Sequence, residues 1–392
     1  MQATRMVTAP AELTAPDGKG GELGATVAIS GSVIVLGAPD TYGGFGTSGT
    51  AYLYVEPSGG WTSMQPTADL LVTGYEEYGA SVAISGDTVV VGAPLNILLS
   101  GFPGAAFVFV KPPGGWATMA PTATLTDSNG SDAFGTTVAI DGDTIVVGAP
   151  GSNIGSNTEQ GAAYVFVKPS GGWTNMTESA KLTDTDGYTQ QLFANTVAIS
   201  GSTIVAGTGN GDQNSAYVFV EPAGGWIDMT ETAELTPSDG VLGDHFGSAV
   251  GVRGNTIAVT SPAKEIGSNA GQGAAYVYVK PTGGWTTATQ TAELTASNGT
   301  TASRLGQSVF VTDNSVLAGA EDVISGHGGV CVFIQPPTGW ENMTQNSELV
   351  YPAAGGEAAW FGSSVAQSGR NIVIGAPALG TNAPGAAYVF TQ

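Results

Sequence analysis

Few side chains of this sequence are of the types that usually perform catalysis. Of its 392 residues only His245 and His327 titrate near neutral pH, and neither lies in a recognisable nucleophile motif. The one cysteine, Cys331, stands where equivalent segments of the chain have tyrosine, so we expect a small core residue there. A single cysteine also excludes an internal disulfide.

His327 with Glu321 and Asp322 is the best group for acid–base or metal chemistry, but its spacing is unspecific and ordinary surface-loop chemistry explains it better. The glycine-rich stretches precede strands rather than helices, so they are not phosphate-binding loops. We therefore expect no catalytic residues and a protein that is not an enzyme. A hydrolase or lyase that uses surface carboxylates is the alternative.

Acidic side chains dominate the ionisable groups. Ten Lys and Arg against 32 Asp and Glu give a net charge of −22, which repels nucleic acid and anionic membranes and favours a basic partner. An alternative is that acidic loops only confer solubility. The carboxylates that we expect to bind a partner are Glu76, Glu77, Asp127, Asp132, Asp184, Asp186, Asp212, Asp244, Glu321 and Asp322.

Two acidic segments, 127–132 and 184–187, are similar to the first half of a calcium-binding loop. They lack the bidentate Glu of its twelfth position, and a tight Asn-Gly or Asp-Gly turn explains both segments without an ion. We expect no bound metal and no cofactor.

Six tryptophans follow glycine pairs at regular intervals. Aromatic rings around a rim could stack on sugars, which would make the protein a multivalent lectin. In the competing interpretation each Trp covers the end of a small apolar core and stabilises that edge. The six residues are Trp61, Trp116, Trp173, Trp226, Trp285 and Trp340.

The composition indicates many short strands joined by tight turns. Hydrophobic residues make up 42% of the chain, and its 60 glycines are about twice the usual share. Apolar residues alternate between the glycines, which is typical of strands. No apolar run reaches the roughly 18 to 20 residues that span a bilayer, and residues 1–10 lack the apolar core of a signal peptide.

One block recurs seven times. Each copy opens with a Phe-Gly-like pair, continues through two strands that end near Gly-Ala-Pro, and closes with a third strand, a Gly-Gly-Trp hairpin and a fourth strand. In the third copy we expect these strands at 137–140, 144–147, 162–167 and 180–183. Apolar residues on both strand faces place each small sheet between two neighbours, as in a β-propeller blade. The opening pairs are Leu23-Gly24, Tyr78-Gly79, Phe134-Gly135, Phe193-Ala194, Phe246-Gly247, Leu305-Gly306 and Phe361-Gly362.

The two ends of the chain complement each other. The seventh copy stops after its third strand at 387–390, and residues 11–14 match the fourth strands at 233–236 and 292–295. We predict an all-β fold, a seven-bladed β-propeller of four-stranded antiparallel blades, in which the N-terminal strand closes the last blade. Residues 1–392 form a single domain, and the expected blades lie at approximately 23–70, 78–126, 134–183, 193–236, 246–295, 305–350, and 361–391 plus 11–14.

These residues resemble the FG-GAP repeat family. Phe134-Gly135 is followed thirteen residues later by Gly148-Ala149-Pro150, and the same motif recurs in the second and seventh copies. The resemblance covers essentially the whole chain and is weakest at 207–209, 260–262 and 319–321. The family forms the propeller of integrin alpha subunits and occurs in bacterial surface proteins, so the resemblance implies adhesion outside the cell. The motif indicates the fold strongly and the function weakly, because loops set the function of a propeller.

One departure concerns calcium. The resemblance implies an Asp-rich calcium loop between the first and second strands, because the ion needs six to eight oxygen ligands. Here that place holds only short turns such as Ser85-Gly86-Asp87, Ser200-Gly201-Ser202 and Arg253-Gly254-Asn255. The calcium sites of the family therefore do not carry over.

The loops fall on two faces. In an up-and-down blade, the loop between the second and third strands and the connection to the next blade share one face, here called the irregular face. Its loops vary in length and include 40–49, 95–104, 151–161 and 264–273, whereas the opposite, regular face repeats almost unchanged. Variable loops on a fixed scaffold indicate the working surface.

We therefore expect a secreted or surface-displayed module, monomeric as an isolated domain, without nucleic-acid binding or membrane insertion. Its expected partner is a protein or a glycan, bound through the acidic irregular face. The lectin that uses the Trp rim, and the hydrolase or lyase, are the alternatives.

Overall fold

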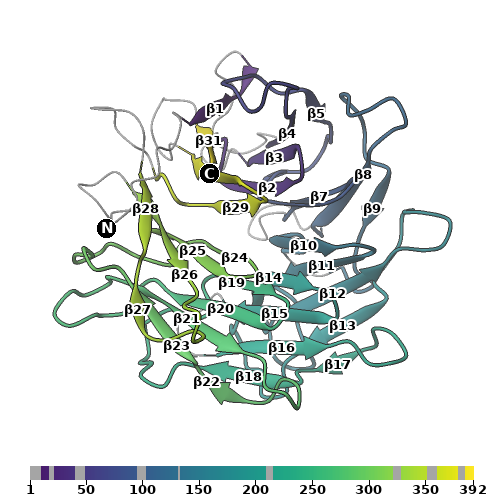
Figure 1. Cartoon of the computed structure of the whole chain (residues 1–392). Coiled ribbons are helices and arrows are strands. Elements are labelled where there is room, and N and C mark those ends of the chain that lie inside the picture. Colours follow the sequence, from purple (N-terminus) through teal and green to yellow (C-terminus); the bar gives the residue numbers. More distant parts are fainter. Residues whose placement is uncertain are drawn as a thin grey trace.

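The computed structural model describes residues 10–16, 22–39, 49–94, 103–130, 133–208, 215–320, 328–350, 360–377 and 385–392. Its strands form seven separate sheets, arranged as a ring around a central channel (Figure 1). This is a seven-bladed β-propeller, so the predicted fold class is confirmed. Among the described residues no helix is long and apolar enough to cross a membrane.

Every blade has the same strand order from the channel outwards. The innermost strands are β2 (Thr26–Ser30), β6 (Ser81–Ser85), β10 (Thr137–Asp141), β14 (Phe193–Ser200), β19 (Val250–Arg253), β24 (Val309–Val311) and β29 (Val365–Ser368). The second strands are β3 (Val33–Ala38), β7 (Thr88–Ala93), β11 (Thr144–Ala149), β15 (Thr203–Thr208), β20 (Thr256–Ser261), β25 (Ser315–Ala320) and β30 (Asn371–Ala376). The third strands are β4 (Thr50–Val55), β8 (Ala105–Val110), β12 (Ala162–Val167), β16 (Ala216–Val220), β21 (Ala274–Val279), β26 (Gly329–Ile334) and β31 (Ala386–Thr391). The outermost strands are β5 (Ala68–Leu70), β9 (Ala123–Leu125), β13 (Ala180–Thr183), β18 (Ala233–Thr236), β23 (Ala292–Thr295), β28 (Ser347–Val350) and β1 (Ala11–Thr14).

The N-terminal strand completes the last blade. β1 pairs antiparallel with β31, with Ala11 opposite Val389 and Thr14 opposite Ala386. Leu13 is fully buried in the core between the last and first blades. The predicted closure is therefore confirmed, and β31 has no open edge.

Three blades contain one strand more than the sequence predicts. The short strands β17 (Met229–Thr230), β22 (Ala288–Thr289) and β27 (Met343–Thr344) come from the hairpin after the third strand. Each pairs in parallel with the outermost strand of the preceding blade. Single bridges such as Leu70 to Met119 make the same connection elsewhere in the ring. The hairpins of blades 1 to 6 therefore join each of these blades to the preceding one.

The Phe-Gly and Gly-Ala-Pro motifs meet between neighbouring blades. A Cβ atom on Gly92 would lie 2.0 Å from the carbonyl oxygen of Gly135 in the next blade. The Ser81 hydroxyl donates to that same carbonyl at 3.1 Å. Gly135 has a φ of +98°, and a Cβ atom there would lie 2.6 Å from the Ala105 carbonyl oxygen. Glycine is thus required on both sides of the interface.

Seven apolar cores lie between adjacent blades. In the core between blades 2 and 3, the fully buried Phe134 packs against Tyr164 and Phe166 with ring centroids 5.6 and 6.0 Å apart. Since each sheet contributes to the core on either side, its strands need apolar residues on both faces.

Candidate functional site

Three carboxylates of the irregular face influence one another: Glu76 and Glu77 lie in the connection between blades 1 and 2, and Glu22 lies in the segment that enters blade 1. Glu76 and Glu77 are half-buried in the connection that follows β5, whereas Glu22 is buried. Burial raises the pKa of Glu77, and the negative charges of Glu76 and Glu22 raise it further. Glu76 and Glu77 are thus partly exposed and close to other negative charges. Such a concentration of negative charge favours a basic partner.

Asp127 and Asp184 lie inside the connections that carry them. Both are buried, and Asp127 Oδ2 accepts the backbone N–H of Asn129 at 3.0 Å. The amides of Gln160 and Gln191 donate to Asp184 at 2.8 and 2.6 Å. These two carboxylates hold loops in shape instead of facing a partner.

Asp244 is also buried, against the buried Lys264. The Lys264 Nζ atom lies 3.3 Å from Asp244 Oδ2 and 3.1 Å from Asp239 Oδ2. The Tyr276 hydroxyl donates to the other oxygen of Asp239 at 3.1 Å. This group of charges fixes the connection between blades 4 and 5.

Asp186 is exposed and is available to a partner. The remaining predicted contact residues, Asp132, Asp212, Glu321 and Asp322, lie outside the described residues, and so does His327. Within the described part of the chain, no group of three or more His, Cys, Asp and Glu side chains is placed to hold a metal ion.

Two irregular-face loops share an Ile-Gly-Ser-Asn sequence that we did not single out from the sequence. Its asparagines reach the connection to the next blade: Asn157 Nδ2 donates to the Gly187 carbonyl at 2.7 Å, and Asn269 Nδ2 to the Gly299 carbonyl at 3.1 Å. The repeated four letters were the available signal. These bonds make the irregular face a preformed surface in blades 3 and 5.

The tryptophans of the hairpins belong to the apolar cores. Trp116, Trp173, Trp226, Trp285 and Trp340 are only 5% to 9% exposed, and Trp61 packs partly buried against the core between the last and first blades. Rings in this position cannot stack on a sugar. The structure therefore supports the structural interpretation of the Gly-Gly-Trp rim and gives no support to the lectin alternative.

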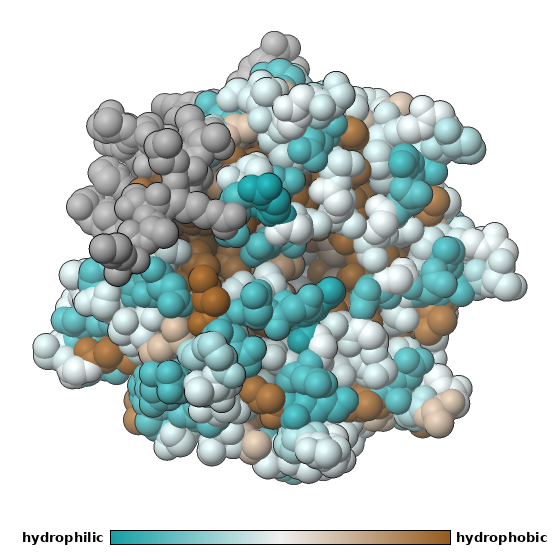
Figure 2. All heavy atoms as spheres, in the orientation of Figure 1, coloured by the Kyte–Doolittle hydropathy of each residue, from teal (hydrophilic) through white to brown (hydrophobic). Residues whose placement is uncertain are grey.

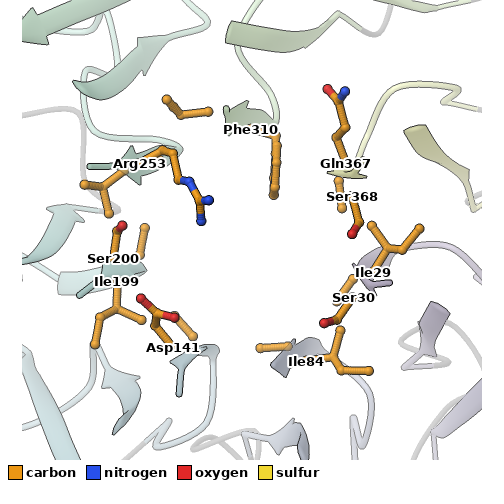
Figure 3. Close-up of a pocket in the computed structure, with 18 of the residues that line it drawn as sticks. Ile29, Ser30, Ile84, Asp141, Ile199, Ser200, Arg253, Phe310, Gln367 and Ser368 are labelled. Atoms are coloured by element: carbon orange, nitrogen blue, oxygen red, sulfur yellow. The ribbon is translucent and has the colours of Figure 1, made fainter. Parts of the chain in front are cut away.

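The central channel is a concavity that sequence reasoning missed. Its volume is about 660 Å³, within the usual range of small-molecule sites, and the innermost strands of all seven blades line it (Figure 3). Each of these strands pairs along one edge only, so its free edge presents backbone N–H and C=O groups to the channel. The space-filling view shows the ring hollowed at its centre, with both hydrophilic and hydrophobic side chains around the opening (Figure 2). The channel therefore suits water or a polar ligand.

Hydrogen bonds link the blades around the channel at the regular face. In each link, the glycine N–H of a turn donates to the residue that ends the innermost strand of the preceding blade. Between blades 5 and 6 an ion pair takes this place, with Arg253 Nε 2.8 Å from Asp313 Oδ1. The glycine links are Gly31 to Ser368, Gly86 to Ser30, Gly142 to Ser85, Gly201 to Asp141 and Gly254 to Ser200, at 2.6 to 3.2 Å.

Seven blades locked together through Phe-Gly and Gly-Ala-Pro contacts define a repeat-built β-propeller. The model of the FG-GAP repeat family matches residues 7–54, 72–109, 121–166, 176–219, 229–278 and 345–390. The chain therefore belongs to the FG-GAP repeat family, as the resemblance in sequence implied. No curated protein matches the chain in sequence.

Among solved structures, the chain is similar to a protein from Bacteroides uniformis described as a "putative 6-phosphogluconolactonase". The two are 13% identical, the TM-score is 0.55, and the match covers 87% of this chain and 88% of the other. The expectation that the protein is not an enzyme is corrected by this likeness, because a propeller of the same form carries the name of a hydrolase. The scarcity of histidine and cysteine, on which that expectation rested, does not exclude hydrolysis by carboxylates.

Proposed function

We propose that this propeller is a binding module of the cell exterior, which presents its acidic irregular face to a basic protein partner. The charge distribution carries the proposal. The described part of this face has ten carboxylates and two basic side chains, Lys264 and Arg304. Lys264 is buried and held by two aspartates, so it does not offset the charge seen by a partner.

Location outside the cell agrees with the family, whose repeats are typical of extracellular proteins. The hydrogen-bonded loops of the irregular face agree with a binding role, because groups that are already fixed lose little entropy when a partner binds. The contact groups are the exposed or half-buried Glu76, Glu77, Asp186 and Glu265.

Charge reversal tests the proposal. Binding of an immobilised lysine-rich peptide would be measured at several salt concentrations for wild type and for the double variant Glu76→Lys/Asp186→Lys. We expect at least tenfold weaker binding and a smaller salt dependence for the variant. The control is Glu56→Lys/Glu221→Lys on the regular face, where the equivalent residues of other blades are Lys111, Lys168 and Lys280. Equal losses in both variants would show that only net charge matters and would contradict the proposal.

Hydrolysis is the second candidate, and the name of the structural relative favours it. Its test is proton release from 6-phosphogluconolactone by wild type and by Asp141→Asn, since Asp141 is an exposed carboxylate that lines the channel. Turnover above the spontaneous rate that falls in the variant would support it, and a rate equal to the spontaneous one would contradict it.

A further inference from the structure

The innermost strands repeat a short sequence, and several exceptions to it line the channel. Blades 1 to 4 all have Val-Ala-Ile, as in 27–29 and 82–84. Blade 6 has Phe310 at the position of the alanine, where blade 5 has Gly251. The other six blades have alanine or glycine at this position, so the fold of a blade does not require a large side chain there. Phe310 therefore needs another explanation.

Phe310 is half-buried, and Figure 3 shows its ring extending into the opening. The ring packs against the cores on both sides of blade 7, and its exposed part faces a channel that aliphatic side chains such as Ile29, Ile84 and Ile199 also line. This exposed part is an apolar surface on which the apolar face of a ligand can pack.

Two charged exceptions also line the channel. Most copies end the innermost strand in serine, but blade 3 has Asp141 and blade 5 has Arg253. In Figure 3 the guanidinium group of Arg253 points into the opening, between Phe310 and Asp141. Asp313 occupies only the Nε atom of Arg253 in the ion pair, so the terminal nitrogens remain as donors toward the channel.

Asp141 and Ser200 supply the complementary groups. One oxygen of Asp141 accepts the Gly201 N–H at 2.6 Å, which leaves its second oxygen as an acceptor. The Ser200 oxygen accepts the Gly254 N–H at 3.2 Å, which leaves the hydroxyl proton as a donor. Donors, an acceptor and an aromatic ring thus face one another across the opening.

We propose that this part of the channel, formed by Asp141, Ser200, Arg253 and Phe310, binds a neutral sugar ring of monosaccharide or disaccharide size. A sugar offers hydroxyl groups that donate and accept together, and an apolar C–H face that packs on an aromatic ring. The charged residues that line the channel are Asp141, Asp313 and Arg253, which together give a net charge of −1 and disfavour an anion. The inference is independent of the function proposed for the irregular face.

The test is calorimetric titration of the full chain with neutral monosaccharides and disaccharides, each at up to about 10 mM, where a ligand of millimolar Kd is near saturation. We expect a sugar to bind and to raise the unfolding midpoint of the wild-type chain by mass action. Phe310→Ala, Asp141→Ser and Arg253→Ser each restore a residue that other blades carry, so they are expected to fold. Each should weaken binding at least tenfold.

Gln367→Ile is the matched control. It also restores the repeat at a channel position, but the Gln367 amide donates to Gly369 O at 3.1 Å and its oxygen is enclosed, so sugar binding should not change. Titrations with gluconate, inorganic phosphate and adenosine complete the comparison. Absence of any sugar binding, binding of an anion or adenosine alone, or equal affinity in the three site variants and wild type would each overturn the proposal. Glu76→Lys/Asp186→Lys should bind the sugar normally, which separates this test from that of the irregular face.

Discussion

Glycine sets how closely neighbouring blades approach. A Cβ atom on Gly375 would lie 1.9 Å from the carbonyl oxygen of Gly24, across the closure of the ring. A Cβ atom on Gly92 would likewise lie 2.0 Å from the carbonyl oxygen of Gly135. Blade 5 has Thr260 instead, and its hydroxyl accepts the Ala249 N–H at 3.0 Å. The side chain that replaces glycine thus bonds within its own blade, and a Cβ atom on Gly306 of the next blade would lie 2.6 Å from the Cβ atom of Thr260.

The first prediction compares two glycines of blade 2. Gly92→Ala forces a methyl group into the Gly135 carbonyl and should cost about 3 kcal/mol of unfolding free energy in urea denaturation. Gly114→Ala is the control, because no atom lies within 4 Å of the added Cβ and its φ is not positive. That variant should stay within about 0.5 kcal/mol of wild type. Equal stability of both variants would refute the close-contact explanation.

The second prediction concerns Glu77 and pH. Its pKa is raised in the folded state, so the native protein holds this proton more tightly than the unfolded chain. The contribution to stability is therefore fully present below the unfolded pKa and is lost as pH rises through the folded pKa. Glu77→Gln should be more stable than wild type at pH 7, and the difference should vanish near pH 4. A variant that is less stable at pH 7 would show that the ionised Glu77 is stabilising.

At the scale of elements, the Gly-Gly-Trp hairpin joins one blade to the preceding one. Its backbone adds a parallel bridge, as Met229 does to Leu182, and its ring enters the core between the same two blades. The hairpin therefore stabilises an interface through both backbone and side chain.

The third prediction tests whether the hairpin tryptophans stabilise the fold or are free to bind sugars. Trp226 is 7% exposed and its neighbour Ile227 is 56% exposed. Trp226→Ala should lose about 3 to 5 kcal/mol of unfolding free energy, whereas Ile227→Ala should change it by less than about 0.5 kcal/mol. Thermal and urea unfolding would measure both. A stable Trp226→Ala variant would mean that the ring has another task.

At the scale of the molecule, the two faces differ in charge. Half of the chain's ten basic side chains, Lys111, Lys168, Arg253, Lys280 and Arg370, lie on the regular face, which also has the ring of glycine links around the channel. The described part of the irregular face has ten carboxylates and two basic side chains. The two proposals thus place a large basic partner on the irregular face and a small ligand in the channel.

The fourth prediction tests the closure of the ring. Deletion of residues 1–16 removes β1 and exposes the backbone edge of β31. Loss of the strand's hydrogen bonds and of Leu13 burial should cost several kcal/mol, at roughly 0.5 to 1.5 kcal/mol per net bond. Light scattering should also show oligomers, because open edges pair with other chains. Leu13→Ala, which removes only the side chain, should be destabilised but monomeric; a stable, monomeric deletion variant would contradict the closure.

The sequence was sufficient for the blades, their number and their closure. These features follow from signals that are local along the chain: alternation with period two, glycine turns, and self-similarity between copies such as 11–14 and 233–236. A repeated unit can bury both faces only between copies of itself, so the ring follows from the repeat.

Only the tertiary structure decided which polar residues are available. Asp186 is exposed while Asp184, two residues before it, is buried and bonded to Gln160 from another loop and to Gln191 from the far end of its own connection. The channel and its Phe310 became visible only once strands about 55 residues apart in sequence faced a common axis. Burial and convergence are properties of contacts between blades, and a sequence pattern within one blade does not contain them.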